Sequence, residues 1–244
     1  MSAVTTKVIA ATPVAENVVR LDVAVPENCT WKTGEFARVA LPGADESHWR
    51  CYSIASATGA DKLTFFIARV KGGVVSPKLC ALKAGDSIQV DTEMCGMLIE
   101  DRLEVGGKDL WLFATGTGVA PFIGVADDPA IMDKYEHVIL VHGVRNFDET
   151  SYVGKNIKLQ DKLTAVACVT REKGAVIEKR IPDALRTGEL ERVVGLEITP
   201  EKSRVMLCGN PAMVKGIREL MKERNIVSPR GGKPGQLLAE NFWL

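Results

Sequence analysis

The segment Leu110-Trp111-Leu112-Phe113-Ala114-Thr115-Gly116-Thr117-Gly118-Val119-Ala120-Pro121 joins a continuous apolar run to a glycine-rich loop and a helix start. Such an apolar run is typical of a strand that is buried on both faces of a parallel sheet. Glycines let the backbone come close to a ligand, and the free amides of a helix start attract phosphate. Pro121 stands where the usual dinucleotide fingerprint has its third glycine, so the loop is a variant of that motif.

Three further apolar runs follow this segment, and helical patterns lie between them. The runs are Val138–Val141, Ala165–Val169 and Val205–Cys208, and the helical patterns are Ala120–Ala126, Thr150–Leu163, Ile181–Arg186 and Pro211–Arg224. This alternation predicts a doubly wound α/β domain with a parallel sheet, which binds ligands at the carboxyl ends of its strands. Glycine or arginine stands at three of these ends and predicts a nucleotide cleft there, in His142-Gly143-Val144-Arg145, Thr170-Arg171 and Cys208-Gly209-Asn210-Pro211.

The first part of the chain has a different pattern, in which apolar and polar residues alternate between turn residues. The expected strands are Val8–Ala15, Val18–Val25, Glu35–Leu41, Arg50–Ser56, Leu63–Val70 and Ser87–Val90. One helix is expected over Ser76–Leu82, with Ser76 as its N-cap. Six strands and one short helix predict a small antiparallel β-barrel. We therefore expect a two-domain α+β protein, with the barrel over residues 1–104 and the α/β domain over residues 105–244.

Within the predicted barrel, Arg50-Cys51-Tyr52-Ser53 combines groups that suit a ligand with a planar head and a phosphate tail. Arg50 offers a fork of donors for a diphosphate, Tyr52 a flat ring for stacking, and Ser53 a hydroxyl for a ring atom. The segment Lys71–Ser76 places glycines before a helix start, which could hold the same diphosphate from a second side. An ordinary surface strand and a plain capped turn would have the same features, so both interpretations stand at this point.

Three arginines could form a cationic cluster in the second domain. Arg145, Arg171 and Arg180 suit the extra phosphate of NADP, because guanidinium groups bind phosphate in fork geometry. No carboxylate stands at a second strand end about 20 residues after the glycine loop, where an NAD enzyme would hold a ribose hydroxyl. Solvated surface arginines are the alternative reading.

The composition argues against several other classes of protein. The chain has 31 acidic and 31 basic residues, so neither nucleic acid nor an anionic membrane is an expected partner. Its six cysteines include no Cys-x-x-Cys pair, which opposes a zinc or iron–sulfur site and indicates reduced thiols. No apolar run is long enough to span a bilayer, and no signal-peptide pattern opens the chain. We expect a cytoplasmic monomer without a metal.

Taken together, the motifs resemble those of the ferredoxin–NADP(H) reductase family, most closely its bacterial branch. Arg50–Ser53 is similar to the family's RxYS flavin motif, Gly73–Ser76 to its GxxS turn, and Gly116–Pro121 to its GTGxAP segment. Val205–Val214 resembles its CGNPxM segment, and Glu240–Trp243 its aromatic end. The matches run in the family's order from residue 50 to the C-terminus.

The resemblance implies an FAD-binding barrel, an NADP-binding domain, and hydride transfer between NADPH and flavin N5 at their junction. It implies catalytic roles for Ser53, near N5, and for Cys208 and Glu240, which would flank the reacting carbon. It implies an FAD site made of Arg50, Cys51, Tyr52, Ser53, Phe66, Ile67, Ala68, Arg69, Val74, Val75, Ser76, Phe242 and Trp243. It implies a site for NADPH or NADP+ made of Thr117, Val144, Arg145, Thr170, Arg171, Arg180, Gly209, Asn210, Pro211, Ala212 and Met213.

By the same resemblance, the chain is an FAD-dependent reductase that exchanges electrons between NADPH and ferredoxin or flavodoxin. The alternatives are the reductase component of an oxygenase, a free-flavin reductase, and a flavin redox sensor without turnover. Oxygenase reductases often carry an iron–sulfur domain, which the cysteine spacing excludes within this chain. The chain departs from the family in Phe242, often a tyrosine, and in Leu244, which extends beyond Trp243. Which aromatic covers the isoalloxazine and which the adenine is therefore open.

Overall fold

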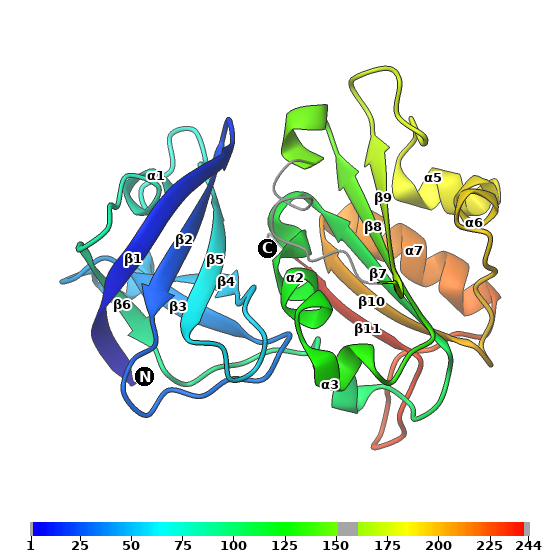
Figure 1. Cartoon of the computed structure of the whole chain (residues 1–244), viewed down its shortest axis with the longest axis horizontal. Coiled ribbons are helices and arrows are strands. Elements are labelled where there is room, and N and C mark those ends of the chain that lie inside the picture. Colours follow the sequence, from blue (N-terminus) through cyan, green and yellow to red (C-terminus); the bar gives the residue numbers. More distant parts are fainter. Residues whose placement is uncertain (1, 151–160, 242–244) are drawn as a thin grey trace.

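The structure, a computed structural model, describes residues 2–150 and 161–241. Over these residues it contains two sheets of different kinds, an antiparallel one with six strands and a parallel one with five. The two sheets stand side by side, and helix α2 (Ala120–Ala126) lies between them (Figure 1). The α+β fold expected from the sequence is thereby confirmed.

The antiparallel sheet has the strand order β4-β3-β6-β1-β2-β5. Its elements are β1 (Ala3–Ala15), β2 (Val18–Ala24), β3 (Phe36–Ala40), η1 (Glu46–His48), β4 (Arg50–Ser53), β5 (Lys62–Ala68), α1 (Ser76–Leu79) and β6 (Ser87–Asp91). The two edge strands meet, because the amide of Ala55 after β4 donates to the carbonyl of Thr64 in β5 at 2.8 Å. The sheet therefore curls into the barrel that the alternating pattern predicted.

The strands of the barrel follow the period of two that the sequence shows. Along β5, Phe65 and Ile67 are fully buried in the barrel interior, whereas Phe66 between them belongs to a different core. Successive side chains point to opposite faces of a strand, so Phe66 points out of the barrel. This outward position matters for the junction described below.

The parallel sheet has the order β11-β10-β7-β8-β9. Its strands are β7 (Asp109–Thr115), β8 (His137–Val144), β9 (Leu163–Val169), β10 (Ser203–Gly209) and β11 (Leu237–Asn241). Strand β7 comes first in the chain, with β8 on one side and β10 on the other. The strand order therefore reverses between β7 and β10, and ligands of such sheets bind at the carboxyl ends of the strands at this point.

Helices cover both faces of the parallel sheet. Helices α2 and α3 (Pro129–Met132) lie on the face toward the barrel, and α5 (Ile181–Arg186), α6 (Glu189–Val194) and α7 (Pro211–Glu223) lie on the other (Figure 1). Helix α7 packs through one apolar stripe, formed by Met213, Val214, Ile217 and Met221. Single-turn helices occur at η2 (Glu100–Arg102), η3 (Gly116–Val119) and η4 (Phe147–Thr150).

One apolar core continues across the junction between the sheets. Phe66 from the barrel belongs to the same buried cluster as Ile123 of α2 and the strands behind it. The backbones also touch, because a Cβ on Gly124 of α2 would lie 3.2 Å from the carbonyl oxygen of Ser56. The barrel and the parallel sheet are therefore packed as one body.

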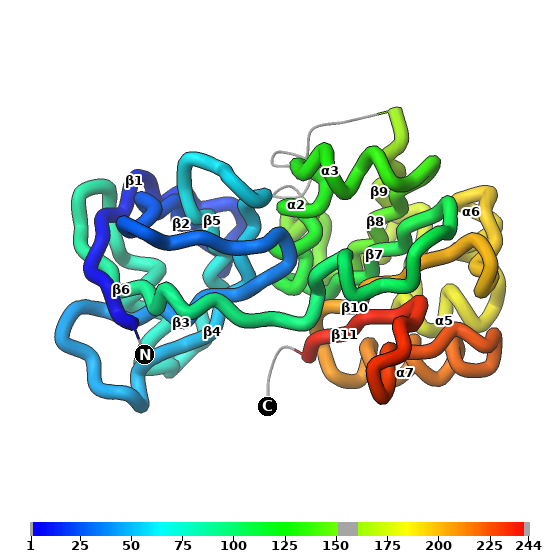
Figure 2. The backbone as a smooth tube through the Cα atoms, turned by 90° about the horizontal axis from the view of Figure 1, so that it is seen from below, coloured from blue at the N-terminus to red at the C-terminus, as the bar shows by residue number. Residues whose placement is uncertain are grey.

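The connecting segment, residues 92–108 between β6 and β7, crosses from the barrel to the parallel sheet (Figure 2). It is fixed to the barrel where Phe36 and Cys95 exchange two backbone hydrogen bonds of 2.7 and 3.2 Å. It is fixed to the parallel sheet where the buried guanidinium of Arg204 donates to the carbonyl of Glu104 at 2.7 Å. The segment is thus held at both ends.

Two strands differ most from the prediction, and β4 also ends at Ser53 rather than Ser56. Strand β1 begins at Ala3 rather than Val8, because its first residues pair with β6 while the later ones pair with β2. Strand β11 was not predicted: the sequence indicated an aromatic tail there, whereas Leu237–Asn241 adds a fifth strand parallel to β10. This edge strand carries Glu240 into the sheet.

Helices α3 and α6 were not predicted, and two of the expected helices differ from the prediction. Helix α1 ends at Leu79 instead of Leu82, and its N-cap is Val75 rather than Ser76. Of the helix expected over Thr150–Leu163, residues 151–160 lie outside the described residues, and Leu163 already begins β9. None of the helices within the described ranges is long and apolar enough to cross a membrane.

Candidate active site at the junction of the two sheets

The carboxyl ends of β7 and β10 are packed backbone to backbone, because glycines stand at the contact. A Cβ on Gly118 in η3 would lie 2.6 Å from the carbonyl oxygen of Cys208. A Cβ on Gly209 would lie 2.2 Å from Thr115 Oγ1, and Gly209 also has a φ of +140°, which other residues rarely adopt. The glycines of both predicted motifs therefore serve to bring the loop after β7 directly onto Cys208.

Three polar residues meet at this contact, and we call them the junction cluster: Ser53, Cys208 and Glu240. The register of β10 and β11 places Glu240 directly beside Cys208. Ser53, at the end of β4 of the barrel, lies beside Cys208, and its hydroxyl acts to lower the pKa of the Cys208 thiol. Ser53 is 3% exposed and Cys208 is 0% exposed, so bulk water is kept from this contact. The structure thus brings together the three residues for which the resemblance implies catalysis.

Burial sets the protonation of the junction cluster. It raises the pKa of the Cys208 thiol well above its usual value, and the Glu240 carboxylate raises this pKa further. Cys208 is therefore a neutral thiol near neutral pH. Burial also raises the pKa of Glu240, while hydrogen bonds from the amides of Met97 and Leu98 act to lower it. The charge of Arg102 lowers the pKa of Glu240 as well.

Arg50 and Tyr52 stand beside the junction cluster on β4. The Nη1 atom of Arg50 donates to the carbonyls of Ser47 and Trp49 at 2.7 and 2.8 Å. Its remaining guanidinium nitrogens make no hydrogen bond to the part of the chain that the structure describes. Tyr52 is half-buried against the barrel core, and burial raises its pKa to about 12, so the phenol stays neutral. A flat ring beside donors of a guanidinium suits a planar head and a diphosphate tail.

The turn before α1 fits a diphosphate through its backbone rather than through a side chain. Ser76 does not cap the helix as predicted, because its Oγ accepts the amide of Val70 at 3.0 Å and closes the turn. The amides of Val74 and Val75 have no hydrogen-bond partner among the described residues. Unpaired amides in a tight turn bind anionic oxygens.

The other residues expected to contact the flavin lie along β4 and β5. Cys51 is exposed on β4, and Phe66 and Ile67 are buried within β5. Ala68 ends β5, and the exposed Arg69 after it donates its amide to the carbonyl of Asn17 at 2.7 Å. Because the side chain of Ile67 fills the barrel, only its backbone can meet a ligand.

The ends of β8 and β9 bring two of the predicted arginines together. The amide of Thr170 donates to the carbonyl of Val144 at 3.2 Å, and the amide of the next residue, Arg171, donates to the carbonyl of Arg145 at 2.9 Å. Arg180 precedes α5 as its N-cap residue. The side chains of Arg145, Arg171 and Arg180 are exposed, and none of them forms an ion pair within residues 2–150 and 161–241.

Two carboxylates near these arginines are engaged by backbone amides. Glu149 Oε1 accepts the amides of Arg145 and Asn146 at 3.1 and 3.0 Å. Glu172 Oε2 accepts the amide of Phe147 at 2.5 Å. The guanidinium groups are therefore left without a carboxylate partner, which suits a phosphate ligand.

The start of α7 is tied to the glycine loop. Asn210 caps α7 by accepting the amide of Ala212 at 2.8 Å, and its own amide donates to Thr115 Oγ1 at 2.8 Å. Pro211 occupies the first turn, and Thr117 lies half-buried in η3. The side chain of Met213 is buried in the core on the far side of the sheet, so it is not placed for a ligand.

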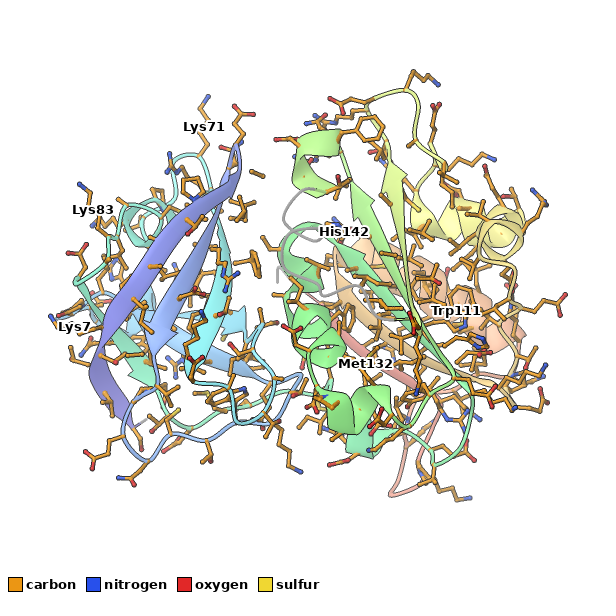
Figure 3. The ribbon with its side chains drawn as sticks, viewed as in Figure 1. Lys7, Lys71, Lys83, Trp111, Met132 and His142 are labelled. Carbon is orange, nitrogen blue, oxygen red and sulfur yellow. The ribbon has the colours of Figure 1, made fainter. Side chains whose placement is uncertain are left out.

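Sequence reasoning missed the role of His142, which lies in β8 beneath the glycine loop (Figure 3). Its Nε2 atom is 2.9 Å from the carbonyl oxygen of Gly116, and a carbonyl can only accept, so Nε2 carries the proton. Burial lowers the pKa of His142 to about 4, which keeps the ring neutral. The available signal was one polar residue inside the apolar run of β8.

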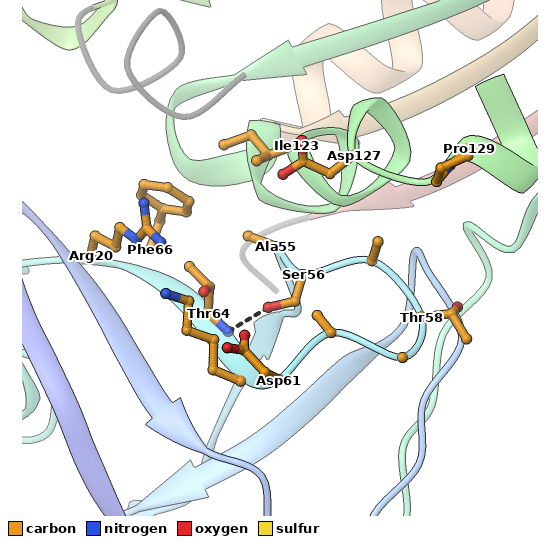
Figure 4. Close-up of a pocket in the computed structure, with 14 residues that line it drawn as sticks. Arg20, Ala55, Ser56, Thr58, Asp61, Thr64, Phe66, Ile123, Asp127 and Pro129 are labelled. Carbon is orange, nitrogen blue, oxygen red and sulfur yellow. Dashed lines mark hydrogen bonds between the residues drawn. The ribbon is translucent and has the colours of Figure 1, made fainter. Parts of the chain in front are cut away.

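A hollow outside the junction cluster lies between α2 and the loop after β4 (Figure 4). Ile123 of α2 and Asp127, which follows the helix, line one side of it, and Ser56 and Thr58 line the other. The amide of Thr64 donates to Ser56 Oγ at 2.8 Å and fixes that side. No member of the junction cluster lines the hollow, so it is distinct from the site built above.

Some expected features lie outside the described residues. The aromatics Phe242 and Trp243, and Leu244 after them, fall in this part of the chain, so their expected contacts stay predictions. Within the described part, no group of three or more metal-ligating side chains comes together.

The barrel offers guanidinium and amide donors for a diphosphate, and it faces the point where the strand order of the parallel sheet reverses. A thiol, a carboxyl and a hydroxyl group lie between the two. These features together define an oxidoreductase that depends on a flavin and a nicotinamide nucleotide. Residues 5–96 match the oxidoreductase FAD-binding domain, and residues 112–219 match the oxidoreductase NAD-binding domain. A ferredoxin–NADP reductase of Pseudomonas aeruginosa is 36% identical over 227 residues, which cover 88% of this chain and 87% of that protein. The chain belongs to the ferredoxin–NADP reductase family, as the motifs predicted.

Two further relatives agree with this assignment. A flavodoxin/ferredoxin–NADP reductase of Escherichia coli is 33% identical over 216 residues, which cover 86% of this chain and 87% of that protein. The crystal structure of a ferredoxin NADP+ reductase from Neisseria gonorrhoeae with bound FAD and NADP superimposes with a TM-score of 0.91 at 29% identity. The superposition covers 99% of both chains, so the arrangement of the two sheets is common to both proteins.

Proposed function

We propose that this protein is a ferredoxin/flavodoxin–NADP reductase, which exchanges electrons between NADPH and a one-electron carrier. The family membership and the paired FAD-binding and NAD-binding domains support this activity. Bound FAD would supply the chemistry that links a two-electron hydride donor to a one-electron acceptor. The residues of this chain bind and orient the two cofactors.

The junction cluster is the observation that carries the proposal. It joins Ser53 of the barrel to Cys208 of the parallel sheet, at the point where that sheet binds nucleotides. A neutral thiol and a small hydroxyl can lie against a planar ring without placing a charge there. Glu240 adds a carboxyl group that can hold a proton near the reacting atoms. The burial of Ser53 and Cys208 excludes water from the place of transfer.

We assign the FAD diphosphate to Arg50 and the turn before α1. The donors of Arg50 that lack a partner in the described chain support this role, as do the free amides of Val74 and Val75. Tyr52 would stack on the isoalloxazine, and the backbone of residues 66–69 would line it. Phe242 and Trp243 would cover the remaining face.

We assign the 2′-phosphate of NADP to Arg145, Arg171 and Arg180. Their exposure and lack of carboxylate partners in the described chain support this role. Thr117 and the segment Gly209–Met213 would face the nicotinamide side. Here the backbone of Met213, rather than its buried side chain, would take part.

A two-stage assay tests the proposed activity. NADPH-dependent reduction of ferricyanide by the purified FAD-loaded protein would distinguish an enzyme from a redox sensor without turnover. Reduction of cytochrome c with added ferredoxin or flavodoxin would then identify the carrier. Turnover that needs free flavin instead of a protein carrier would favour the free-flavin reductase, and turnover only with an oxygenase partner would favour the oxygenase component.

Four further statements belong to the same proposal. We propose that the domain limits are residues 1–104 and 105–244, consistent with the connecting segment between the sheets. We also propose that the protein is a cytoplasmic monomer that meets its carrier transiently. Size-exclusion chromatography with light scattering would test the monomer, and a stable dimer would contradict it.

A further inference from the structure

The carboxylate of Glu240 is held by main-chain amides from the other side of the junction. The amide of Met97 donates to Glu240 Oε1, and the neighbouring amide of Leu98 acts to lower the pKa of the same carboxyl. Both amides belong to the connecting segment, whereas Glu240 belongs to β11 at the edge of the parallel sheet. The bonds therefore link two parts of the chain that are more than a hundred residues apart.

The turn that presents these amides, residues 95–98, is fixed to the barrel; we call it the amide clamp. Cys95 pairs with Phe36 by two backbone hydrogen bonds. Gly34 packs against Leu98 so closely that a Cβ would lie 1.9 Å from the carbonyl oxygen of Leu98. Gly34 has a φ of +97°, which a glycine adopts without strain. The clamp is thus a rigid donor pair rather than a free loop.

Gly96 makes the approach of Glu240 to the clamp sterically feasible. It has a φ of +151°, and a Cβ there would lie 3.0 Å from Glu35 Cα and 3.3 Å from Glu240 Oε1. Any larger residue would therefore push the turn away from Glu35, which precedes β3, from the carboxylate, or from both. The space that Glu240 occupies exists because position 96 has no side chain.

We propose that the amide clamp is a positioning element, which fixes the Glu240 carboxylate beside Cys208 and makes Gly96 a positioning residue for the reaction. A glutamate has three rotatable side-chain bonds, and β11 is the edge strand of its sheet. The bond from the Met97 amide, with the Leu98 amide beside it, restricts this freedom, and charge-assisted bonds of this kind are the strong ones. This inference rests on the proposed role of Glu240.

The groups that face Glu240 come from three other elements. Cys208 on β10 and Cys51 on β4 both sense its charge, and Arg102 in η2 contributes the only positive charge that acts on it within the described chain. The clamp therefore acts on a carboxylate that is stabilised by the charge of one exposed cation, Arg102, without a direct ion pair. The amide of Met97 is the direct hydrogen-bond donor.

Amide hydrogen exchange tests the clamp without depending on activity. In the FAD-loaded protein, the amides of Met97 and Leu98 should exchange at least about tenfold faster after Glu240→Ala, because about 1.4 kcal/mol corresponds to tenfold. The amide of Cys95 donates to Phe36 instead and should keep its rate, so it serves as the internal control. Unchanged rates at both clamp amides, or a rise no larger than that at Cys95, would overturn the proposal.

A second test perturbs the clamp and leaves Glu240 in place. In Gly96→Ala, the side-chain carboxyl of Glu240, followed by carbon-13 NMR and assigned with Glu240→Gln, should titrate about one pKa unit higher. The matched control is Gly85→Ala, which changes an exposed glycine with a φ of +92° and no atom within 4 Å of the added Cβ. The control should leave the titration unchanged.

Kinetics on the same variants separate this inference from the proposed function. Hydride transfer from NADPH in Gly96→Ala should shift its pH midpoint with the Glu240 titration, while the Kd for NADPH stays within about twofold. An unchanged titration would refute the clamp. A shifted titration with an unchanged pH profile would instead refute the catalytic role of Glu240. Should Gly96→Ala fail to fold, the exchange test on Glu240→Ala still decides the matter.

Discussion

Acid should destabilise this protein through one buried ring, that of His142. Its pKa is about 4 in the folded protein, against 6.5 for a solvated histidine. Between these values the unfolded chain binds a proton that the folded chain does not, so the free energy of unfolding falls as the pH decreases. The full difference amounts to about 3 kcal/mol, of which about 2 kcal/mol is lost between pH 8 and pH 5. Such a loss is a large fraction of the stability of an ordinary domain.

Urea unfolding of the wild-type protein and of His142→Gln, at a fixed excess of FAD, measures this effect. Glutamine keeps an N–H group that can reach the carbonyl of Gly116, and it does not titrate. Contributions from the carboxylates are shared by both proteins, so they cancel in the difference. The stability of the wild type relative to the variant should fall by about 2 kcal/mol from pH 8 to pH 5. A difference that stays constant over this range would refute the reasoning.

Three other outcomes follow from contacts described above. Arg50→Ala should raise the Kd for FAD about ten- to a hundredfold, because a charged hydrogen bond contributes about 1.5–3 kcal/mol. Full FAD occupancy in the variant would contradict the assignment. Mass spectrometry that finds FMN instead of FAD released from the wild type would contradict it as well. Arg171→Ala and Arg180→Ala should each lower kcat/KM for NADPH about ten- to a hundredfold and leave kcat/KM for NADH unchanged. Equal losses of kcat/KM with both coenzymes would mean that these arginines are structural. Gly118→Ala should lower stability by about 1–3 kcal/mol, because the added Cβ would meet the carbonyl oxygen of Cys208 at 2.6 Å; an unchanged melting temperature would contradict this.

The sequence predicted those parts of the molecule that have a local signature. The apolar run over Leu110–Ala114 marks a strand buried on both faces, and the glycines after it mark a close approach of backbones. Strand β11 has no such signature, because Leu237–Asn241 shows no alternation and its identity as a strand depends on pairing with β10. The Ser76 hydroxyl could cap a helix or bond to Val70, and only the folded turn decides between them.

The amide clamp shows a further limit of sequence reasoning. The donors of Met97 and Leu98 are backbone groups that every residue except proline carries. No side-chain pattern in the sequence therefore indicates these donors, and the carboxylate that they face, Glu240, lies near the other end of the chain. His142 is an intermediate case, since a polar residue in an apolar strand is visible in the sequence, but its acceptor in the glycine loop is not.

The apolar core that crosses the junction bears on how such proteins can be recombined. Phe66 of the barrel packs with Ile123 of α2, and Gly124 lets the helix backbone touch the loop at Ser56. A chimera that joined residues 1–104 to the parallel sheet of a distant homologue would leave this surface unmatched, even with every cofactor motif intact. The outer face of β5 and helix α2 must therefore come from the same parent protein. These two elements lie on opposite sides of the boundary between residues 104 and 105, at which the chain would ordinarily be divided.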